Sequence, residues 1–236
     1  MQTEIIINEA LAIKVKEVVS KGLTKGLGKP NLGEMCVEAA VNYACGLPHG
    51  DNPSCVGSAV RAFKIRLNDA QWSSNDARAK GMLKVAIGQL GSNTINQVEF
   101  AKIVAFKTII VLIPVILRDR GFEAEAVLCE SSKDLKEAKA NIWTVKSKLW
   151  DAAPADYAAA NAAYYATAAD TDYADYAAYA AAATAADADY AADAAAAAAI
   201  ATAADADKYL LISANICLEA LIELKSPGIK FLYLCD

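Results

Sequence analysis

The stretch SCVGSAVRAFKIRLNDAQWSSNDARAKGMLKVAIGQLG, residues 54–91, decides the fold class because it carries two helix patterns in succession. In the first pattern, apolar residues recur at spacings of four, three and four, which places them on one face of an α-helix with Ser54 as its N-cap. The second pattern follows Ser73-Ser74-Asn75-Asp76, which we interpret as a capping box, and ends at Gly91. The apolar residues of the first pattern are Val56, Val60, Phe63 and Leu67.

The residues before this stretch predict two more helices, each followed by a loop. Helical spacing of apolar residues favours a helix over 8–21, and the four Gly and one Pro of residues 21–34 favour a loop. A second helix is expected over 35–45, stopping at Gly46. The next residues, GLPHGDNPS at 46–54, are too rich in turn formers to continue it.

The residues after the stretch are also predicted to be helical. A long apolar helix is expected over 96–120, kinked by Pro114 and ended by Gly121. Ser131 or Ser132 is the expected cap of a charged helix that reaches Trp150. An amphipathic helix follows over 208–225, and IKFLYL at 229–234 is compatible with a short terminal strand.

Residues 151–207 form a compositionally distinct arm, with ten Asp, no basic residue and, over 152–207, 33 Ala and seven Tyr. Alanine has the highest helix propensity, and TAAD recurs at Thr167, Thr184 and Thr202, about five helical turns apart. A small-residue helix-packing surface and a partly disordered low-complexity tail are both open interpretations; the uneven threonine spacing disfavours an ice-binding helix.

We therefore expect an all-α protein: a globular helical domain over 1–150, an Ala-rich helical arm over 151–207, and a C-terminal helix and tail over 208–236.

Charge and cysteine content narrow the function classes. Residues 1–150 carry a net charge of +5 against −10 for the arm, within a total of −5, so a uniform binder of polyanions is excluded. No helix-turn-helix, zinc-finger or RNA-binding signature is present, and double-stranded nucleic acid is not an expected partner. The apolar run 109–117 is too short for a membrane span and carries a proline. Six scattered cysteines and no signal-peptide pattern indicate a cytoplasmic protein with reduced thiols.

The densest functional pattern is GEMCVEAAVNYACGLPHGDNPSCVGSAVRAFKIRLNDAQW, residues 33–72, which holds the single His and three of the six Cys. Its CVEAAV and PHGDNPSCV segments resemble a block in proteins of bacterial and phage genomes, some of which also end in Ala/Tyr/Asp-rich repeats. The resemblance covers about residues 30–91 and the arm. It implies a bacterial or viral setting and no particular activity.

One interpretation of this block is a thiol hydrolase. Cys36 is expected in the first turn of its helix, where the helix dipole lowers a thiol pKa. His49 would be the base, oriented by Asp51 or Asn42. No local signature of a known thiol hydrolase accompanies these residues.

A structural zinc site is a weaker interpretation of the same block. Cys36, Cys45, His49 and Cys55 are suitable ligands within 20 residues. However, Cys36 and Cys45 lie nine positions apart on one predicted helix, which separates them by about 13 Å along its axis. We therefore predict neither a metal site nor a cofactor.

The favoured interpretation is anion binding. Arg61, Lys64 and Asn68 recur at helical spacing and are expected opposite the apolar stripe, with Trp72 and Arg78 following. Free backbone amides at the two predicted helix starts suit a phosphate group. A basic solvated face, or a docking surface for the acidic arm, is the simpler explanation of the same pattern.

We accordingly expect non-enzymatic binding or sequestering of an anionic, nucleotide-like small molecule, and self-association through the Ala-rich arm. The alternatives are a Cys–His thiol hydrolase that uses Cys36, His49 and Asp51, and a purely structural, oligomerising helical protein. The residues expected to contact the anionic ligand are His49, Arg61, Lys64, Asn68, Trp72 and Arg78.

Overall fold

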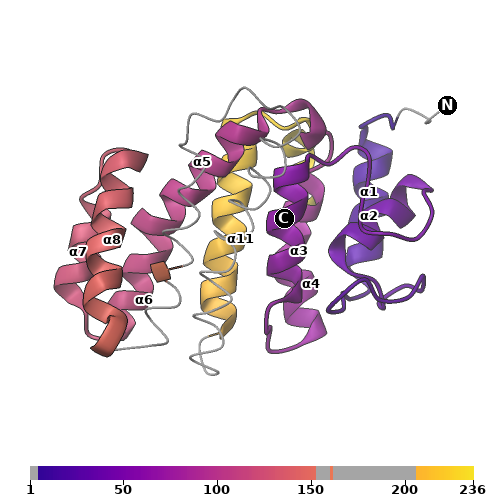
Figure 1. Cartoon of the computed structure of the whole chain (residues 1–236). Helices are drawn as coiled ribbons and strands as arrows, with labels where there is room; N and C mark the ends of the chain where they lie inside the picture. The colour runs from indigo at the N-terminus through magenta and orange to yellow at the C-terminus, as the bar shows by residue number, and fades with distance from the viewer. Residues whose placement is uncertain (1–4, 153–159, 162–205) are drawn as a thin grey trace.

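The computed structural model describes residues 5–152, 160–161 and 206–236 (Figure 1). Over these residues every regular element is a helix and no strand is present, which confirms the all-α class. The prediction that 151–207 forms a helical arm lies outside the described residues except at 151–152, 160–161 and 206–207. The α-helices are α1 (Glu9–Val19), α2 (Val37–Cys45), α3 (Ser58–Asp69), α4 (Asn75–Gly88), α5 (Gln97–Lys107), α6 (Ile113–Asp119), α7 (Glu123–Glu130), α8 (Leu135–Ala152) and α11 (Ala206–Glu223).

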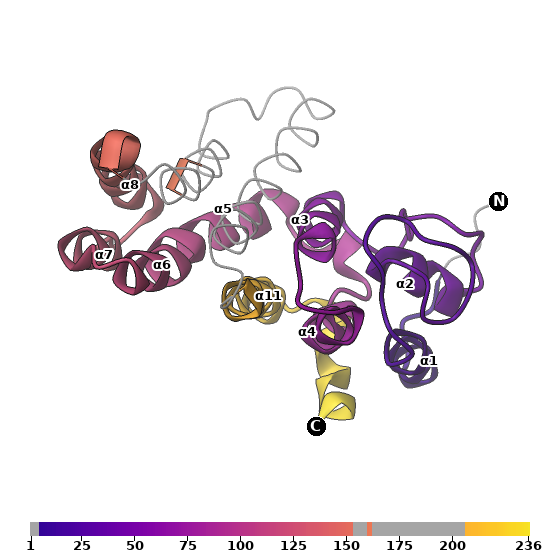
Figure 2. The same ribbon diagram turned by 90° about the horizontal axis from the view of Figure 1, so that it is seen from below.

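The helices stand side by side in a row that runs from α7 and α8 at one end to α1 and α2 at the other (Figure 1). Seen along the helices, the row is curved, with α11 and α4 in its middle (Figure 2). Helix α11 packs on α4, α5 and α3, so the C-terminal helix returns to the centre of the body. The second half of the body is built around α6, which packs on α7.

The apolar stripe of α3 is buried as its spacing predicts. Val60, Phe63 and Leu67 have no exposed surface, and the ring of Phe63 meets that of Phe100 from α5 edge-on at 6.3 Å. Edge-to-face packing of this kind adds to the stabilisation that burial provides. This stripe therefore holds α3 against α5.

The start of α3 differs from the prediction, because Gly57 and not Ser54 is the N-cap. The caps come from elsewhere in the chain: Gln97 Oε1 accepts from the Ala59 N–H, and Ser92 Oγ accepts from the Gly57 N–H. A Cβ on Gly57 would lie 2.2 Å from the Gln97 amide, so only glycine permits this approach. A local cap by Ser54 is unnecessary once these side chains supply the acceptors.

The capping box at Ser73 is also wrong, by one residue. Helix α4 begins after Ser74, whose Oγ accepts from the Ala77 N–H at 3.0 Å. The Ser73 N–H donates instead to Asp207 at the start of α11, at 2.8 Å. A long-range contact has replaced the local one. The predicted end of α4 near Leu90 is close to the observed Gly88, and Gly91 has the expected positive φ of 80°.

The predicted kink at Pro114 is a turn of π-helix, η2 (Thr108–Leu112), between α5 and α6. The Ile113 N–H donates to the Thr108 carbonyl five residues earlier, so this turn contains one residue more than an α-helical turn. The wide turn lies directly before Pro114, which has no backbone N–H to donate. The whole segment Gln97–Asp119 is long and apolar enough to cross a membrane. Its most apolar stretch of 18 residues has a mean hydropathy of 2.3, but 67% of that stretch is buried inside the fold. This burial is typical of a core helix.

Two further expectations need correction. Helix α8 is capped by Asp134, whose Oδ1 accepts from the Glu137 N–H at 2.8 Å, and not by Ser131 or Ser132. The terminal segment forms a 3₁₀-helix, η4 (Pro227–Cys235), where a strand was considered. It packs on α4, and Ser226, the residue before it, donates its hydroxyl to the Gly88 carbonyl at 2.7 Å.

Replacing Phe63 with alanine tests the importance of the α3–α5 contact. Removing a fully buried aromatic ring leaves a cavity that the neighbouring side chains cannot fill, which lowers the free energy of unfolding by about 3–5 kcal/mol. Urea denaturation of F63A measures the loss. The matched control is V111A, a surface truncation at a side chain that is 42% exposed, for which we expect a change within about 0.5 kcal/mol. Equal effects of the two substitutions would contradict this account of the core.

Candidate functional site

Lys64, a predicted ligand contact, is instead half of a buried ion pair. Its side chain has no exposed surface, and its Nζ lies 3.1 Å from Glu38 Oε1 on α2. The Gln89 amide from the end of α4 donates to the other oxygen of Glu38 at 3.2 Å. Burial raises the pKa of Glu38, while Lys64 and Gln89 oppose that rise. The prediction that Lys64 faces away from the apolar stripe is wrong, because α2, α5 and α11 also cover α3.

Asn68 likewise lies inside the fold, with no exposed surface. Its Oδ1 accepts from the Val37 N–H at the start of α2, and its Nδ2 donates to the Thr24 carbonyl in the loop before it. The side chain of Asn68 therefore fixes the loop over 20–36 to α3. The prediction that Asn68 faces away from the apolar stripe towards solvent is also wrong, because α2, α5 and α11 cover α3 on several sides.

Trp72 and Arg78 support the turn between α3 and α4. The indole N–H of Trp72 donates to the Leu67 carbonyl at 2.9 Å, and the ring covers Gly81, where a Cβ would lie 2.4 Å from it. Arg78 is 5% exposed, and its Nε donates to the Asn68 carbonyl at 2.7 Å. Burial lowers the pKa of Arg78, with partial compensation from nearby carboxylates. Trp72 donates to a backbone carbonyl, and Arg78 donates to backbone carbonyls and to Asn75 Oδ1.

The remaining two predicted contacts, His49 and Arg61, are accessible to solvent. His49 is exposed, and its Nε2 lies 3.2 Å from the Gly28 carbonyl, to which it donates. Arg61 is half-buried, and its guanidinium lies 3.8 Å from Asp51. An exposed pair at this distance contributes little to stability. The predicted anion site thus divides into four buried structural residues and two accessible ones.

A small cavity of about 30 Å³ is lined by one residue of the predicted anion site and two residues of the hydrolase alternative. It has the size for about one water molecule. Two carboxylates, Asp51 and Asp69, contribute to its wall, which makes the cavity electrostatically unfavourable for an anion. The predicted residues that line it are Cys36, Asp51 and Asn68.

Cys36 occupies the N-cap of α2, one position before the expected first turn. Its Sγ accepts from the Ala39 N–H at 3.3 Å. Burial nevertheless raises the pKa of Cys36, and the carboxylates of Glu38 and Asp51 add to that rise. The hydrogen bond from the Ala39 N–H lowers the pKa but does not offset burial, so the helix terminus does not activate this thiol. His49, the proposed base, contacts the Gly28 carbonyl.

The four residues considered for zinc are dispersed by the fold. Cys36 caps the start of α2, whereas Cys45 is its last residue. Within the part of the chain that the structure describes, no three His, Cys, Asp or Glu side chains are grouped to hold a metal ion. Cys45 ends α2, and Cys55 lies beyond the turn-rich loop over 46–54. The mutual influence of the two thiols raises the pKa of Cys45 and lowers that of Cys55.

The two ends of the Ala-rich segment join the same body. Helix α8 carries the chain out to Ala152, and α11 receives it at Ala206. Just inside α11, Asp207 accepts from Ser73 at the start of α4, where the helix dipole favours a carboxylate.

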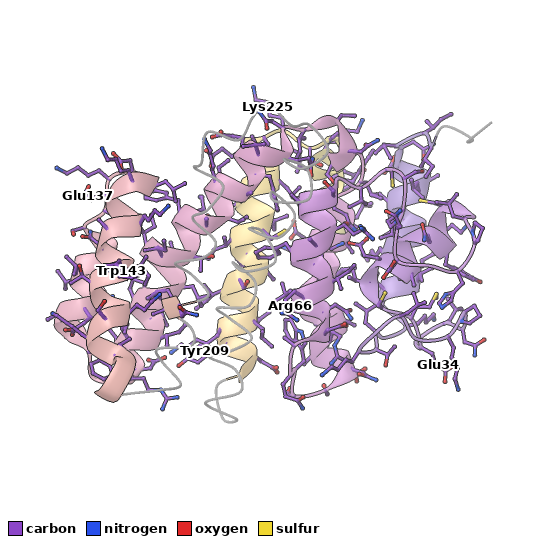
Figure 3. All side chains as sticks on the ribbon, viewed as in Figure 1. Glu34, Arg66, Glu137, Trp143, Tyr209 and Lys225 are labelled. Atoms are coloured by element: carbon purple, nitrogen blue, oxygen red, sulfur yellow. The ribbon has the colours of Figure 1, made fainter. Side chains whose placement is uncertain are left out.

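A second anchor lies one residue further along α11. Asp119 at the end of α6 pairs with Lys208 and accepts from the Tyr209 hydroxyl at 2.9 Å. The hydrogen bond from Lys208 lowers the pKa of Asp119. Figure 3 shows Tyr209 near the N-terminal end of α11, on the side of α6. Side chains from α4 and α6 therefore fix the point at which the segment re-enters the body.

The chain matches no family model, and no curated protein and no solved structure is significantly similar to it. The bacterial or viral setting implied by the CVEAAV and PHGDNPSCV segments stays a prediction. Function must therefore be argued from the chemistry and placement of the residues.

Substitution of Lys64 tests whether its role is structural. K64M leaves the Glu38 carboxylate buried without a counter-charge, and we expect a loss of about 3–5 kcal/mol in the free energy of unfolding at pH 7. Because the pKa of Glu38 is raised in the folded state, the folded chain binds its proton more tightly, and stability falls as pH rises above the ordinary glutamate range. The loss should therefore shrink in acid.

Urea denaturation of K64M over a pH series measures this effect. The double variant E38L/K64M removes both charges, and we expect it to recover most of the loss. A K64M protein as stable as the original chain at pH 7 would contradict a structural role for this pair.

Alkylation by iodoacetamide at neutral pH tests the state of Cys36. An activated nucleophile would be the fastest thiol in the chain, whereas a buried thiol with a raised pKa reacts slowly. We expect Cys36 to react about tenfold or more slowly than the half-buried Cys235. Peptide mass spectrometry against time gives both rates in one sample. Fastest labelling at Cys36 would restore the hydrolase hypothesis.

Proposed function

We propose that this protein is a non-enzymatic helical scaffold that presents its Ala/Tyr/Asp-rich segment, residues 151–207, for self-association. The observation that carries the proposal is the attachment of both ends of this segment to one body. Helix α8 delivers the chain and α11 receives it, with Asp207 and Asp119 making the contacts described above. A segment held in this way begins and ends on the same body.

The composition of the segment favours another copy of this chain as its partner. Alanine buries little area per residue, so an Ala-rich surface gains stability mainly when small residues let two backbones approach closely. The tyrosines add large contact area with few rotatable bonds. The segment carries −10 and the residues before it +5, so the segment of one copy complements the body of another.

The other hypotheses draw less support. Four of the six expected anion contacts are buried and hydrogen-bonded inside the fold, so anion binding is left to the accessible His49 and Arg61. A thiol hydrolase would need an ionised Cys36, whose pKa is raised. A cytoplasmic location is part of the proposal and is supported by the six free thiols, which suit a reducing compartment.

Sedimentation velocity of the full chain over a concentration series tests the proposal. We expect the weight-average mass to rise with concentration and the association to weaken with added salt, because it joins opposite charges. A177E/A197E places two charges in the segment and should shift the association midpoint to at least about tenfold higher concentration, equivalent to about 1.4 kcal/mol.

The matched control adds the same charges to the body. Ala124 on α7 and Ala140 on α8 are exposed, so A124E/A140E should associate as the original chain does. A monomer at all concentrations would contradict the proposal. Equal weakening by both double variants would show that net charge, and not the segment, controls association.

A further inference from the structure

A groove of about 500 Å³ lies between the start of α1 and the end of α2. Apolar side chains form much of its wall and are still in contact with solvent: Ile6 is 74% exposed, and Ile5, Leu11 and Leu47 are only partly buried. Pockets that bind ligands measure about 300–1,000 Å³ and combine apolar walls with a few polar groups. The groove is therefore large enough to take an aromatic side chain, which would cover these apolar atoms.

The groove also carries a positive charge. Lys14 on α1 lines it and is exposed to solvent. Among the described residues, no carboxylate lies within ion-pair distance of the Lys14 ammonium, whereas Lys84, Lys107 and Lys148 each have such a partner. No Asp or Glu is among the described residues that line the groove. Its charge therefore favours a carboxylate from outside.

Two other hollows in the described part of the chain suit a carboxylate less well. One, of about 350 Å³ between the end of α1 and α4, has Asp76 in its wall together with Lys80. The other is the cavity of about 30 Å³, whose wall includes Asp51 and Asp69. Charge therefore favours the groove between α1 and α2 over both of them.

The Ala/Tyr/Asp-rich segment carries the complementary groups in its sequence. The dipeptide Asp-Tyr occurs in it four times, at 156–157, 172–173, 175–176 and 189–190, so four of its seven tyrosines directly follow an aspartate. A tyrosine ring supplies a large contact area with few rotatable bonds, and the neighbouring carboxylate has the charge opposite to that of Lys14. Each dipeptide therefore contains the two groups that suit the groove.

We propose that the groove between α1 and α2 is the surface that receives the Asp-Tyr dipeptides of the segment from a second copy of this chain. The tyrosine ring packs against Ile6, Leu11 and Leu47, and the aspartate pairs with Lys14. The inference rests on the proposed function, because it names the partner surface for self-association through residues 151–207.

The position of the groove suits a contact between copies. Figure 1 shows α1 and α2 at one end of the row of helices, α8 at the other and α11 near the middle. A second copy can therefore dock without displacing Asp207 or Asp119 from their contacts at the start of α11. Such a contact is heterologous, since it leaves a free groove on one copy and a free segment on the other. Association should accordingly continue beyond a dimer as the concentration rises.

Substitution of Lys14 tests the groove, by sedimentation velocity of the full chain over a concentration series. K14E should move the association midpoint to at least about tenfold higher concentration, because a carboxylate then faces the aspartates of the segment. K25E makes the same change in net charge in the loop over 20–36, outside the groove, at another exposed lysine. We expect K25E to associate as the original chain does. Circular dichroism of both variants checks their fold.

The Asp-Tyr dipeptides are tested by comparing two sets of four substitutions to asparagine. Both sets remove the same charge from the segment, but only the first removes the carboxylates beside tyrosine. The first set should therefore move the midpoint to a concentration about tenfold or more above that of the second. The sets are D156N/D172N/D175N/D189N and D170N/D187N/D193N/D205N.

A mixture of two defective proteins separates this inference from the proposed function. K14E keeps a complete segment, and the first asparagine variant keeps a complete groove. An equimolar mixture should therefore form a heterodimer at concentrations at which neither protein associates alone. A mixture that stays monomeric, or equal association of K14E and K25E, would overturn the groove as the docking surface and leave self-association intact. An original chain that is monomeric at all concentrations would overturn both.

Discussion

The buried ion pair between Glu38 and Lys64 is the interaction on which the rest of the body depends. Two opposite charges with no exposed surface are tolerated only when they are paired and their remaining hydrogen-bonding capacity is used, which Gln89 provides for Glu38. The three residues come from α2, α3 and the end of α4, so the pair fixes the relative position of these helices. On α11, burial raises the pKa of Cys217, and the nearby Lys64 and Glu38 act on it in opposite directions.

Once those helices are fixed, the loop over 20–36 and the turn after α3 follow. Asn68 and Arg78 extend the polar network outward from α3 and α4, and their donors end on the backbone carbonyls of Thr24 and Leu23. A polar cluster of this kind has the same residue types as a phosphate site, but its groups point inward. The block over 33–72 is therefore best understood as the frame of the body, with His49 and Arg61 at its surface.

Sequence patterns predicted the parts of this fold that local chemistry decides. The buried stripe through Phe63, the stop at Gly46 and the disturbance before Pro114 all depend on residues close in the chain. The errors occur where a distant residue decides the outcome. Gln97 caps α3, and Asp207 takes the place of a local partner for Ser73. The helical spacing around Lys64 predicts a solvent-facing side chain. Its partner Glu38 lies 26 positions earlier in the sequence, so no local pattern indicates that the two residues pair.

The proposed function lies apart from this frame. The chain enters the Ala-rich segment from α8, at one end of the row of helices, and leaves it at α11, near the middle (Figure 1). The most direct test of the central claim is hydrogen–deuterium exchange of the full chain at low and high protein concentration. The account predicts that amides of residues 151–207 exchange more slowly at high concentration, while those of α2 and α3 do not change. Exchange over 151–207 that is independent of concentration, with new protection at α2 and α3, would contradict it.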